Sequence, residues 1–150
     1  MNIRDRRESD FDRVRVLLEN AGLPVKGIDR TRGWVAEEDD EIASHIALEE
    51  TGDAVVLRSL STTPSAQRRG IARALMELAE QQAGSRASLL RTKTVGPWVL
   101  KRGYVPAQPD QIPQSVQATS EFEGSLCSGF PVYIRNAGTK TPSTTLGSNL

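Results

Sequence analysis

Two arginines and a glycine stand directly before a helical pattern in the segment QRRGIAR, residues 67–73. They follow an apolar, β-prone run that ends near Ser61, so the order along the chain is strand, turn and helix start. The first turn of a helix presents backbone N–H groups without intrahelical partners and a partial positive charge. Gly70 lets the backbone approach a ligand closely, and Arg68 and Arg69 add cationic donors. The segment therefore predicts an anion site of the kind that binds phosphate groups.

Two common phosphate-binding patterns do not fit this segment. The P-loop requires Lys and then Ser or Thr after its last glycine, whereas Ile71 and Ala72 follow Gly70. The dinucleotide fingerprint requires three spaced glycines, and the segment has one. The pattern that remains is Gln/Arg-x-x-Gly-x-Gly/Ala, from Gln67 to Ala72. An ordinary strand–turn–helix with a basic turn is the alternative.

This pattern resembles the acetyl-coenzyme A loop of the GNAT superfamily of acyl-CoA-dependent N-acetyltransferases. Upstream, LSTTP at residues 60–64 resembles the end of the family's central strand. The resemblance implies that the loop amides and the following helix hold the pyrophosphate of acetyl-CoA. It also implies that the strand end pairs with the pantetheine arm and turns a backbone N–H toward the reacting carbonyl. The implied cofactor-binding residues are Leu60, Ser61, Thr62, Gln67, Arg68, Arg69, Gly70, Ile71, Ala72 and Arg73.

The sequence does not assign the general acid and base that such a reaction needs. The resemblance implies a glutamate on the central strand, in a stretch where Val56 stands, and a tyrosine in a later helix, at the place of Val99. Glu49 could act as a base through a water, or be a solvated turn carboxylate. Tyr104 could act as an acid, or be a core aromatic. His45 has a suitable unperturbed pKa, but a packed or surface histidine is the commoner outcome for a mid-strand position.

Arg58 interrupts the apolar central strand, residues 54–60. A buried arginine without a partner is costly, so this side chain must reach solvent, an acid or a ligand. One interpretation is a salt bridge with Glu49 or another carboxylate, and the other is a clamp for an anionic substrate group such as a carboxylate. Thr92 and Thr94 end the next strand and are predicted to line the same cleft.

Periodicity predicts the elements that must position these residues. Strands are expected near residues 2–4, 34–36, 42–48, 54–61, 87–90, 104–105 and 131–135, and helices near residues 9–21, 70–83, 96–102 and 115–121. Ser9 or Asp10 is expected to cap the first helix with its side chain. The helix after the loop is expected to bury a face centred on Ile71, Leu75 and Leu78.

This order fits the mixed α/β fold of the GNAT acyl-CoA N-acyltransferases, with a twisted central sheet flanked by helices. The predicted domain covers residues 1–135. Residues 136–150 are rich in Thr, Ser and Gly and lack apolar side chains to bury, so we expect a disordered tail.

Composition limits the classes of protein that remain. The chain has 150 residues and a formal net charge of zero, so it fits one domain without the basic footprint of a nucleic-acid-binding protein. No apolar stretch approaches the roughly 20 residues of a membrane span. A single cysteine, Cys127, and a single histidine make a metal site unexpected. Without an apolar stretch after the basic start of the chain, we expect a cytoplasmic enzyme. We expect the partner of this enzyme to be a small-molecule amine substrate. A homodimer is one of the oligomeric states that the sequence leaves open.

Five segments, residues 21–24, 57–60, 92–94, 101–104 and 112–127, are similar to the arsenic-resistance-associated subgroup of GNAT N-acetyltransferases. The likeness covers most of residues 3–135 and describes genetic context better than substrate. One cysteine is a poor site for trivalent arsenic, so Cys127 is expected to be a small buried strand residue. The predicted function is acetyl transfer to a small, amino-acid-like amine. A non-catalytic coenzyme A-binding sensor or interaction module is the alternative, because the strand glutamate and helix tyrosine are missing.

Overall fold

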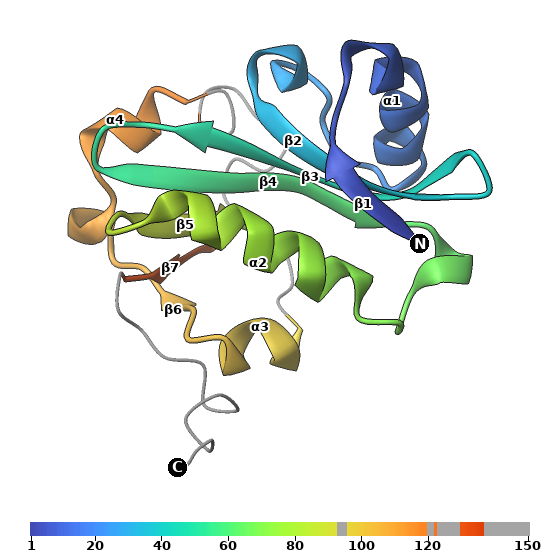
Figure 1. Cartoon of the computed structure of the whole chain (residues 1–150). Helices are drawn as coiled ribbons and strands as arrows, with labels where there is room; N and C mark the ends of the chain where they lie inside the picture. Colours follow the sequence, from blue (N-terminus) through green and yellow to red (C-terminus); the bar gives the residue numbers. More distant parts are fainter. Residues whose placement is uncertain (93–95, 120–121, 123–129, 137–150) are drawn as a thin grey trace. The chain divides into compact units, whose positions relative to one another are not determined.

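A computed structural model describes residues 1–92, 96–119, 122 and 130–136 (Figure 1). The fold is mixed α/β, and its seven strands lie in the order β1-β2-β3-β4-β5-β7-β6. The elements are β1 (Asn2–Asp5), η1 (Glu8–Asp10), α1 (Phe11–Asn20), η2 (Ile28–Arg30), β2 (Arg32–Glu38), β3 (Glu41–Glu50), β4 (Ala54–Thr62), η3 (Pro64–Ala66), α2 (Ile71–Ala83), β5 (Ala87–Arg91), α3 (Pro97–Lys101), β6 (Val105–Pro106), η4 (Pro109–Gln111), α4 (Gln114–Gln117) and β7 (Val132–Arg135). The chain forms two compact units, residues 1–49 with 57–82 and residues 50–56 with 83–150, and each is described by itself.

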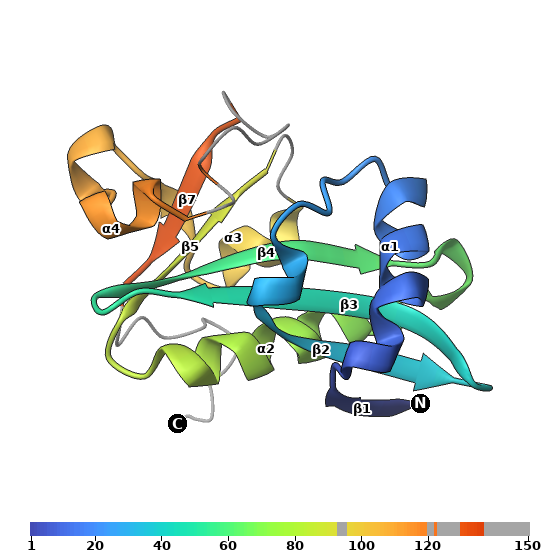
Figure 2. The same ribbon diagram turned by 90° about the horizontal axis from the view of Figure 1, so that it is seen from above.

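The first unit is built on the antiparallel strands β1, β2 and β3. Val35 of β2 lies between Arg4 of β1 and His45 of β3 in the register, so these three side chains share one face of the sheet. A register shift interrupts the β2–β3 ladder between Ala36 and Glu37. Helices α1 and α2 lie on opposite faces of these strands (Figures 1 and 2).

Apolar side chains fill both faces of this unit. On the α1 face the buried cluster consists of Val14, Leu17, Leu18, Ile28, Val35, Ile42 and Ala47. On the α2 face a smaller cluster consists of Ala36, Ala43, Ala66 and Ile71. Strand β3 is therefore buried without a break from Ile42 to Leu48, and a polar side chain in this stretch needs an internal partner.

The buried face of α2 differs in one respect from the expectation. Leu75, Met76 and Ala79 are at most 1% exposed, whereas Leu78 is half-buried. Residues three or four positions apart share one face of a helix, as Met76 and Ala79 do. The buried face of α2 is therefore centred between Leu75 and Met76, and Leu78 lies at its margin. The expectation for Ile71, which is 7% exposed, is confirmed.

The expected side-chain cap of α1 is wrong. Asp10 occupies the N-cap position, but its carboxylate makes no cap hydrogen bond to the helix. Oδ2 of Asp10 instead accepts a hydrogen bond from the backbone N–H of Arg7, at 2.7 Å, in the preceding turn. Charged partners draw this carboxylate away from the helix end, as described below.

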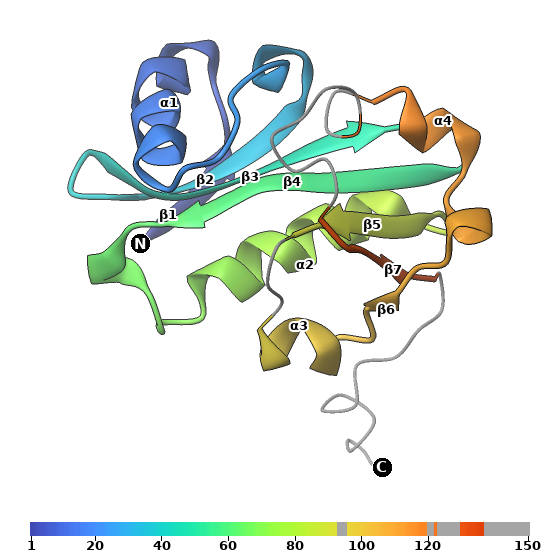
Figure 3. The same ribbon diagram turned by 180° about the vertical axis from the view of Figure 1, so that it is seen from behind.

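The second unit contains β5, β7 and β6, which lie side by side as an antiparallel set (Figure 3). Leu89 of β5 and Val105 of β6 both pair with Ile134 of β7. The buried cluster of this unit consists of Ala54, Val56, Leu89, Val116, Val132 and Ile134. Helix α4 is shorter than expected over its described part, ending at Gln117. Cys127 and residues 137–150 lie outside the described residues, so the predictions for them stay predictions.

Candidate functional site

The end of β4 is tied to β3 by side-chain and backbone hydrogen bonds. The hydroxyl of Ser44 donates to the carbonyl of Ser61 at 2.9 Å and lies 2.8 Å from the hydroxyl of Thr62. The N–H of Thr63 donates to the carbonyl of Ala43 at 2.8 Å. Leu60, Ser61 and Thr62 are half-buried, so this rigid strand end remains accessible.

The turn after β4 carries the predicted anion site. Pro64 to Ala66 form a single 3₁₀ turn, after which the side-chain amide of Gln67 donates to the carbonyl of Thr62 at 3.1 Å. Arg68 and Gly70 both have left-handed backbones, with φ of 65° and 79°. This conformation suits glycine and strains arginine, by about 1–2 kcal/mol. A Cβ added to Gly70 would meet nothing within 4 Å, so the space in front of this residue is open.

Helix α2 begins at this open space. The N–H of Ala74 donates to the carbonyl of Gly70 at 3.1 Å, which makes this the first bond of the helical ladder. Helix geometry then leaves the N–H groups of Ile71, Ala72 and Arg73 without intrahelical acceptors. The expected arrangement of strand, turn and helix start is therefore present in the first unit, and it can hold an anion.

Two of the three arginines at this turn project into solvent. Arg68 and Arg73 are exposed. Arg69 forms a bidentate ion pair with Glu38, at 3.1 and 2.8 Å, in which the two side chains are 43% and 35% exposed. The hydrogen bond from Arg69 lowers the pKa of the Glu38 carboxyl, and the same contact raises the pKa of Arg69. No sequence pattern indicates this pair, which joins residues 31 positions apart.

Arg58 lies in an internal ion pair. Its side chain is 1% exposed and its Nη1 donates to Oε1 of Glu49 at 3.2 Å. Further donations go to the hydroxyl of Ser59 at 3.1 Å and to the carbonyl of Pro24 at 3.4 Å. Of the two interpretations left open, the salt bridge with Glu49 is the one that the structure contains.

Tyr104 and Thr92 belong to the second unit. Tyr104 is 1% exposed, which places it among the packed residues of that unit. Thr92 follows β5 and donates its N–H to the carbonyl of Pro131 at 3.2 Å. Thr94 lies outside the described residues.

His45 is packed, with no exposed surface. Its Nε2 lies 2.9 Å from Nη1 of Arg6, and its Nδ1 lies 2.9 Å from the carbonyl oxygen of Ser59. Burial lowers the pKa of His45 to about 4, and the charges of Arg6 and Arg58 act in the same direction. The imidazole is therefore neutral at pH 7.

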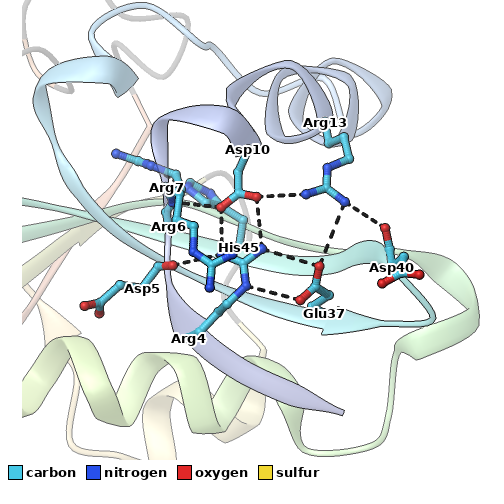
Figure 4. A network of polar contacts seen from close by, with 9 residues as sticks. All are labelled: Arg4, Asp5, Arg6, Arg7, Asp10, Arg13, Glu37, Asp40 and His45. Carbon is cyan, nitrogen blue, oxygen red and sulfur yellow. Dashed lines mark hydrogen bonds and ion pairs between the residues drawn. The ribbon is translucent and has the colours of Figure 1, made fainter.

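A network of arginines and carboxylates around Asp10 was missed by the sequence analysis (Figure 4). Asp10 is 1% exposed, and Arg4 donates to both of its oxygens, at 2.8 and 3.0 Å. Arg13 donates to it at 2.9 Å, and Arg4 also reaches Glu37 at 3.2 Å. The hydrogen bonds from Arg4 hold the pKa of Asp10 well below its usual range.

The alternation of side chains along a strand could have predicted part of this network. Arg4 and Arg6 are two residues apart at the end of β1, so they point to the same face of the sheet, the one that α1 covers. Two arginines on a covered face require acceptors there.

Among the described residues, no helix is long and apolar enough to cross a membrane. In the same part of the chain, no three His, Cys, Asp or Glu side chains gather in a way that could hold a metal ion.

A family model described as an acetyltransferase (GNAT) domain matches residues 29–106, just over half of the chain. The match includes β4, the turn and α2. No curated protein matches the chain.

Solved structures share the fold. N-acetylglutamate synthase from Neisseria gonorrhoeae, complexed with coenzyme A and N-acetyl-glutamate, superposes with a TM-score of 0.75 and 18% identity, over 92% of this chain and 35% of the synthase. A protein from Mycobacterium tuberculosis in complex with coenzyme A gives 0.68 and 13%, over 91% and 99% of the two chains. A GNAT family acetyltransferase from Brucella melitensis in complex with acetyl-CoA gives 0.57 and 24%, over 76% and 92%. The chain thus spans about a third of the synthase.

Proposed function

Because the chain belongs to the acetyltransferase (GNAT) family, we propose that it transfers the acetyl group of acetyl-CoA to the amine of a small molecule. The observation that carries this proposal is the left-handed turn at Gly70, which joins the end of β4 to the first turn of α2. The N. gonorrhoeae, M. tuberculosis and B. melitensis proteins, which bind coenzyme A or acetyl-CoA, support the same ligand for this chain.

The pyrophosphate of coenzyme A is assigned to the turn from Gln67 to Arg73. The N–H groups of Ile71, Ala72 and Arg73 precede the first helical bond and can donate to phosphate oxygens. Gly70 leaves room for those oxygens, because it has no Cβ. Gln67 holds the turn against the strand end through the carbonyl of Thr62.

The thioester end of the cofactor is assigned to Leu60, Ser61 and Thr62. These residues are half-buried, and the strand end that they form is braced by the hydroxyl of Ser44, which donates to the Ser61 carbonyl, and by the N–H of the following Thr63, which donates to the Ala43 carbonyl. A braced N–H is a good donor to a developing oxyanion, because it costs no reorganisation during the reaction. We assign this role to the N–H of Leu60.

The reaction requires two proton movements. The amine nitrogen attacks the thioester carbon, so a C–N bond forms and the carbonyl oxygen becomes an oxyanion. The C–S bond then breaks, coenzyme A leaves as a thiolate that takes up a proton, and the nitrogen loses a proton to give the amide. The chemistry therefore needs a general base near the nitrogen, a hydrogen-bond donor near the oxygen and a source of the proton that the thiolate takes up.

Glu49 is the proposed base, acting through a water. Its side chain is 17% exposed, so a water can reach it, and Arg58 donates to its Oε1 at 3.2 Å. Arg58 then acts as a positioning residue for Glu49, in addition to the proposed contact with an anionic group of the acceptor. The burial of Tyr104 favours a packing role for this residue, so we assign no acid.

The acceptor class is proposed to be an amino-acid-like amine. N-acetyl-glutamate in the N. gonorrhoeae synthase supports this class, although the chain covers only 35% of that protein. Arg58, Thr92 and Thr94 are the residues proposed for the acceptor side. Membership of the arsenic-resistance-associated subgroup is proposed from the sequence resemblance alone, of which residues 112–127 are the most distinctive part.

A non-catalytic coenzyme A-binding module is the second candidate, favoured by Val56 at the place of the family's general base and Val99 at the place of its general acid. Thiol release from acetyl-CoA, measured across a panel of acidic, neutral and basic amines, separates the two. Turnover with any amine above the rate of hydrolysis supports the enzyme. Tight binding of coenzyme A in calorimetry without turnover supports the module, and absence of binding contradicts both.

A further inference from the structure

His45 connects two parts of the first unit that are far apart in sequence. Arg6 belongs to the connection between β1 and η1, and Ser59 belongs to β4. The imidazole lies between them, 2.9 Å from Nη1 of Arg6 and 2.9 Å from the carbonyl oxygen of Ser59. With no exposed surface at His45, the imidazole nitrogens depend on these partners.

The two partners dictate the tautomer of His45. A guanidinium has donors only, so Nε2 must accept the hydrogen bond from Arg6. A backbone carbonyl only accepts, so Nδ1 must carry the proton and donate it to Ser59. The ring is neutral at pH 7, because burial and the charges of Arg6 and Arg58 lower its pKa by more than the hydrogen bond to Ser59 and the charge of Asp10 raise it.

Arg6 is itself held in one position. Its Nη2 donates to the carbonyls of Ile28, at 3.0 Å, and Thr31, and its guanidinium lies 4.8 Å from the ring centroid of Phe11. A Cβ on Gly33 would lie 2.6 Å from Nη1 of Arg6, so this glycine provides the space that the guanidinium fills. The close-up in Figure 4 shows Arg6 and His45 next to one another beneath α1.

Ser59 interrupts the regular backbone of β4. Its φ is 58°, a left-handed conformation that costs a serine about 1–2 kcal/mol. Its carbonyl is held by His45 and its hydroxyl accepts a hydrogen bond from Arg58 at 3.1 Å. Such strain persists only where the surroundings hold the residue in place.

The carbonyl of Ser59 and the N–H of Leu60 belong to the same peptide group. The group is planar and trans, so these two bonds point in opposite directions and turn together. Because the carbonyl of Ser59 points toward the side chain of His45, the N–H of Leu60 points away from it.

We propose that His45 is a positioning residue for acyl transfer, which orients the N–H of Leu60 through its Nδ1–H bond to the Ser59 carbonyl. The inference rests on the proposed function, because it needs the N–H of Leu60 to contact the thioester oxygen. It goes beyond that function by placing the control of this donor in a buried histidine that touches neither cofactor nor substrate.

Two amide variants separate the two hydrogen bonds of the ring. In His45→Asn the amide nitrogen stands where Nδ1 was and can still donate to Ser59. In His45→Gln the amide group reaches the position of Nε2, so the contact with Arg6 is kept and the donor to Ser59 is lost. The measurements are kcat and KM for acetyl-CoA with an amine that the wild type uses, together with the thermal midpoint.

We expect His45→Gln to lower kcat by about tenfold to a hundredfold with little change in KM for acetyl-CoA, since a misplaced donor weakens only the transition state. We expect His45→Asn to retain most of kcat. A merely structural role predicts instead that activity follows the thermal midpoint in both variants. Equal kcat in the two variants at equal folded fraction overturns the proposal.

A second variant keeps the imidazole and moves its partner. Gly33→Ala places a methyl group against the guanidinium of Arg6, which must then leave Nε2 of His45. Nitrogen NMR of the ring should show the loss of the single Nδ1–H tautomer, accompanied by a fall in kcat. Loss of that tautomer with unchanged kcat contradicts the proposal. A wild type that releases no thiol with any amine overturns the proposed function itself, and this inference with it.

Discussion

Arg69 and Glu38 form a bidentate ion pair at the edge of the proposed coenzyme A site, with N–O distances of 3.1 and 2.8 Å. The pair joins the turn before α2 to the end of β2. An exposed pair of this kind contributes little to stability, at most about 1 kcal/mol. The pair should therefore affect the binding of coenzyme A more than stability, because Glu38 places a negative charge beside the site assigned to the pyrophosphate.

Replacing Glu38 by Gln should strengthen the binding of coenzyme A. The substitution removes a competing charge and releases Arg69 to approach the pyrophosphate, so we expect a dissociation constant lower by a few-fold at low salt. Calorimetry at two salt concentrations measures this, and the gain should shrink at high salt. Glu19→Gln removes an equal charge from α1 and is the control; equal effects of the two substitutions would show that only net charge matters.

Replacing Gly70 by Asp should abolish most of the affinity for coenzyme A. The carboxylate would occupy the space assigned to the pyrophosphate and repel it, so we expect at least a tenfold weaker binding, about 1.4 kcal/mol. Gly84→Asp is a matched control, because Gly84 follows the other end of α2, has φ of 60° and also has open space around a Cβ. The assignment fails if a folded Gly70→Asp protein binds as well as this control.

Removing the guanidinium of Arg58 should destabilise the protein. Arg58→Met removes the guanidinium that donates to Glu49 at 3.2 Å, and breaking a buried pair costs about 3–5 kcal/mol. Arg58→Lys keeps the charge but loses the fork that reaches Glu49, Ser59 and Pro24, so we expect a smaller loss. Urea unfolding measures both.

Kinetics then decides whether Arg58 also contacts the acceptor. A purely internal pair predicts equal losses of kcat/KM for an acidic and a neutral amine. A contact with an acceptor carboxylate predicts a selective loss for the acidic amine, with acetyl-CoA affinity intact.

Acidification should destabilise the protein through His45. The folded state holds the pKa of His45 at about 4, against 6.5 for a free histidine, so the unfolded state binds the extra proton between these values. Stability is thus present above pH 6.5 and is lost as the pH falls toward 4, by up to about 3 kcal/mol. The pKa of Asp10 is lowered mainly by the hydrogen bonds from Arg4. Asp10 therefore adds a further loss of folding stability only at pH values below the ordinary pKa of an aspartate.

Urea unfolding of the wild type and of His45→Gln at pH 7 and pH 4.5 isolates the histidine. The variant cannot titrate at this position, so it should lose less stability between the two pH values. Parallel losses would show that His45 has an ordinary pKa.

Truncation after residue 135 tests the predicted domain boundary. Residues 136–150 offer few apolar side chains, so their removal should leave the thermal midpoint and thiol release nearly unchanged. A lower midpoint would mean that this segment packs against the domain or a second subunit.

The sequence by itself determined the candidate site at the turn, because its structure is local. Gly70 before an apolar period of 3.6 residues predicts a turn and a helix start from neighbouring residues alone, and the first helical bond, from Ala74 to Gly70, agrees. The strands were also predictable, although their ends were not, since ladder partners rather than propensity extend β2 to Arg32 and Glu38.

Only the tertiary structure decided which polar residues meet. Arg6, His45 and Ser59 are separated by 39 and 14 positions, and no periodicity relates them. The same holds for Arg69 and Glu38, and for the choice of Glu49 as the partner of Arg58. Long-range pairs form because burial or charge leaves each group in need of a partner, and the sheet order, not the local sequence, determines which partner lies within reach.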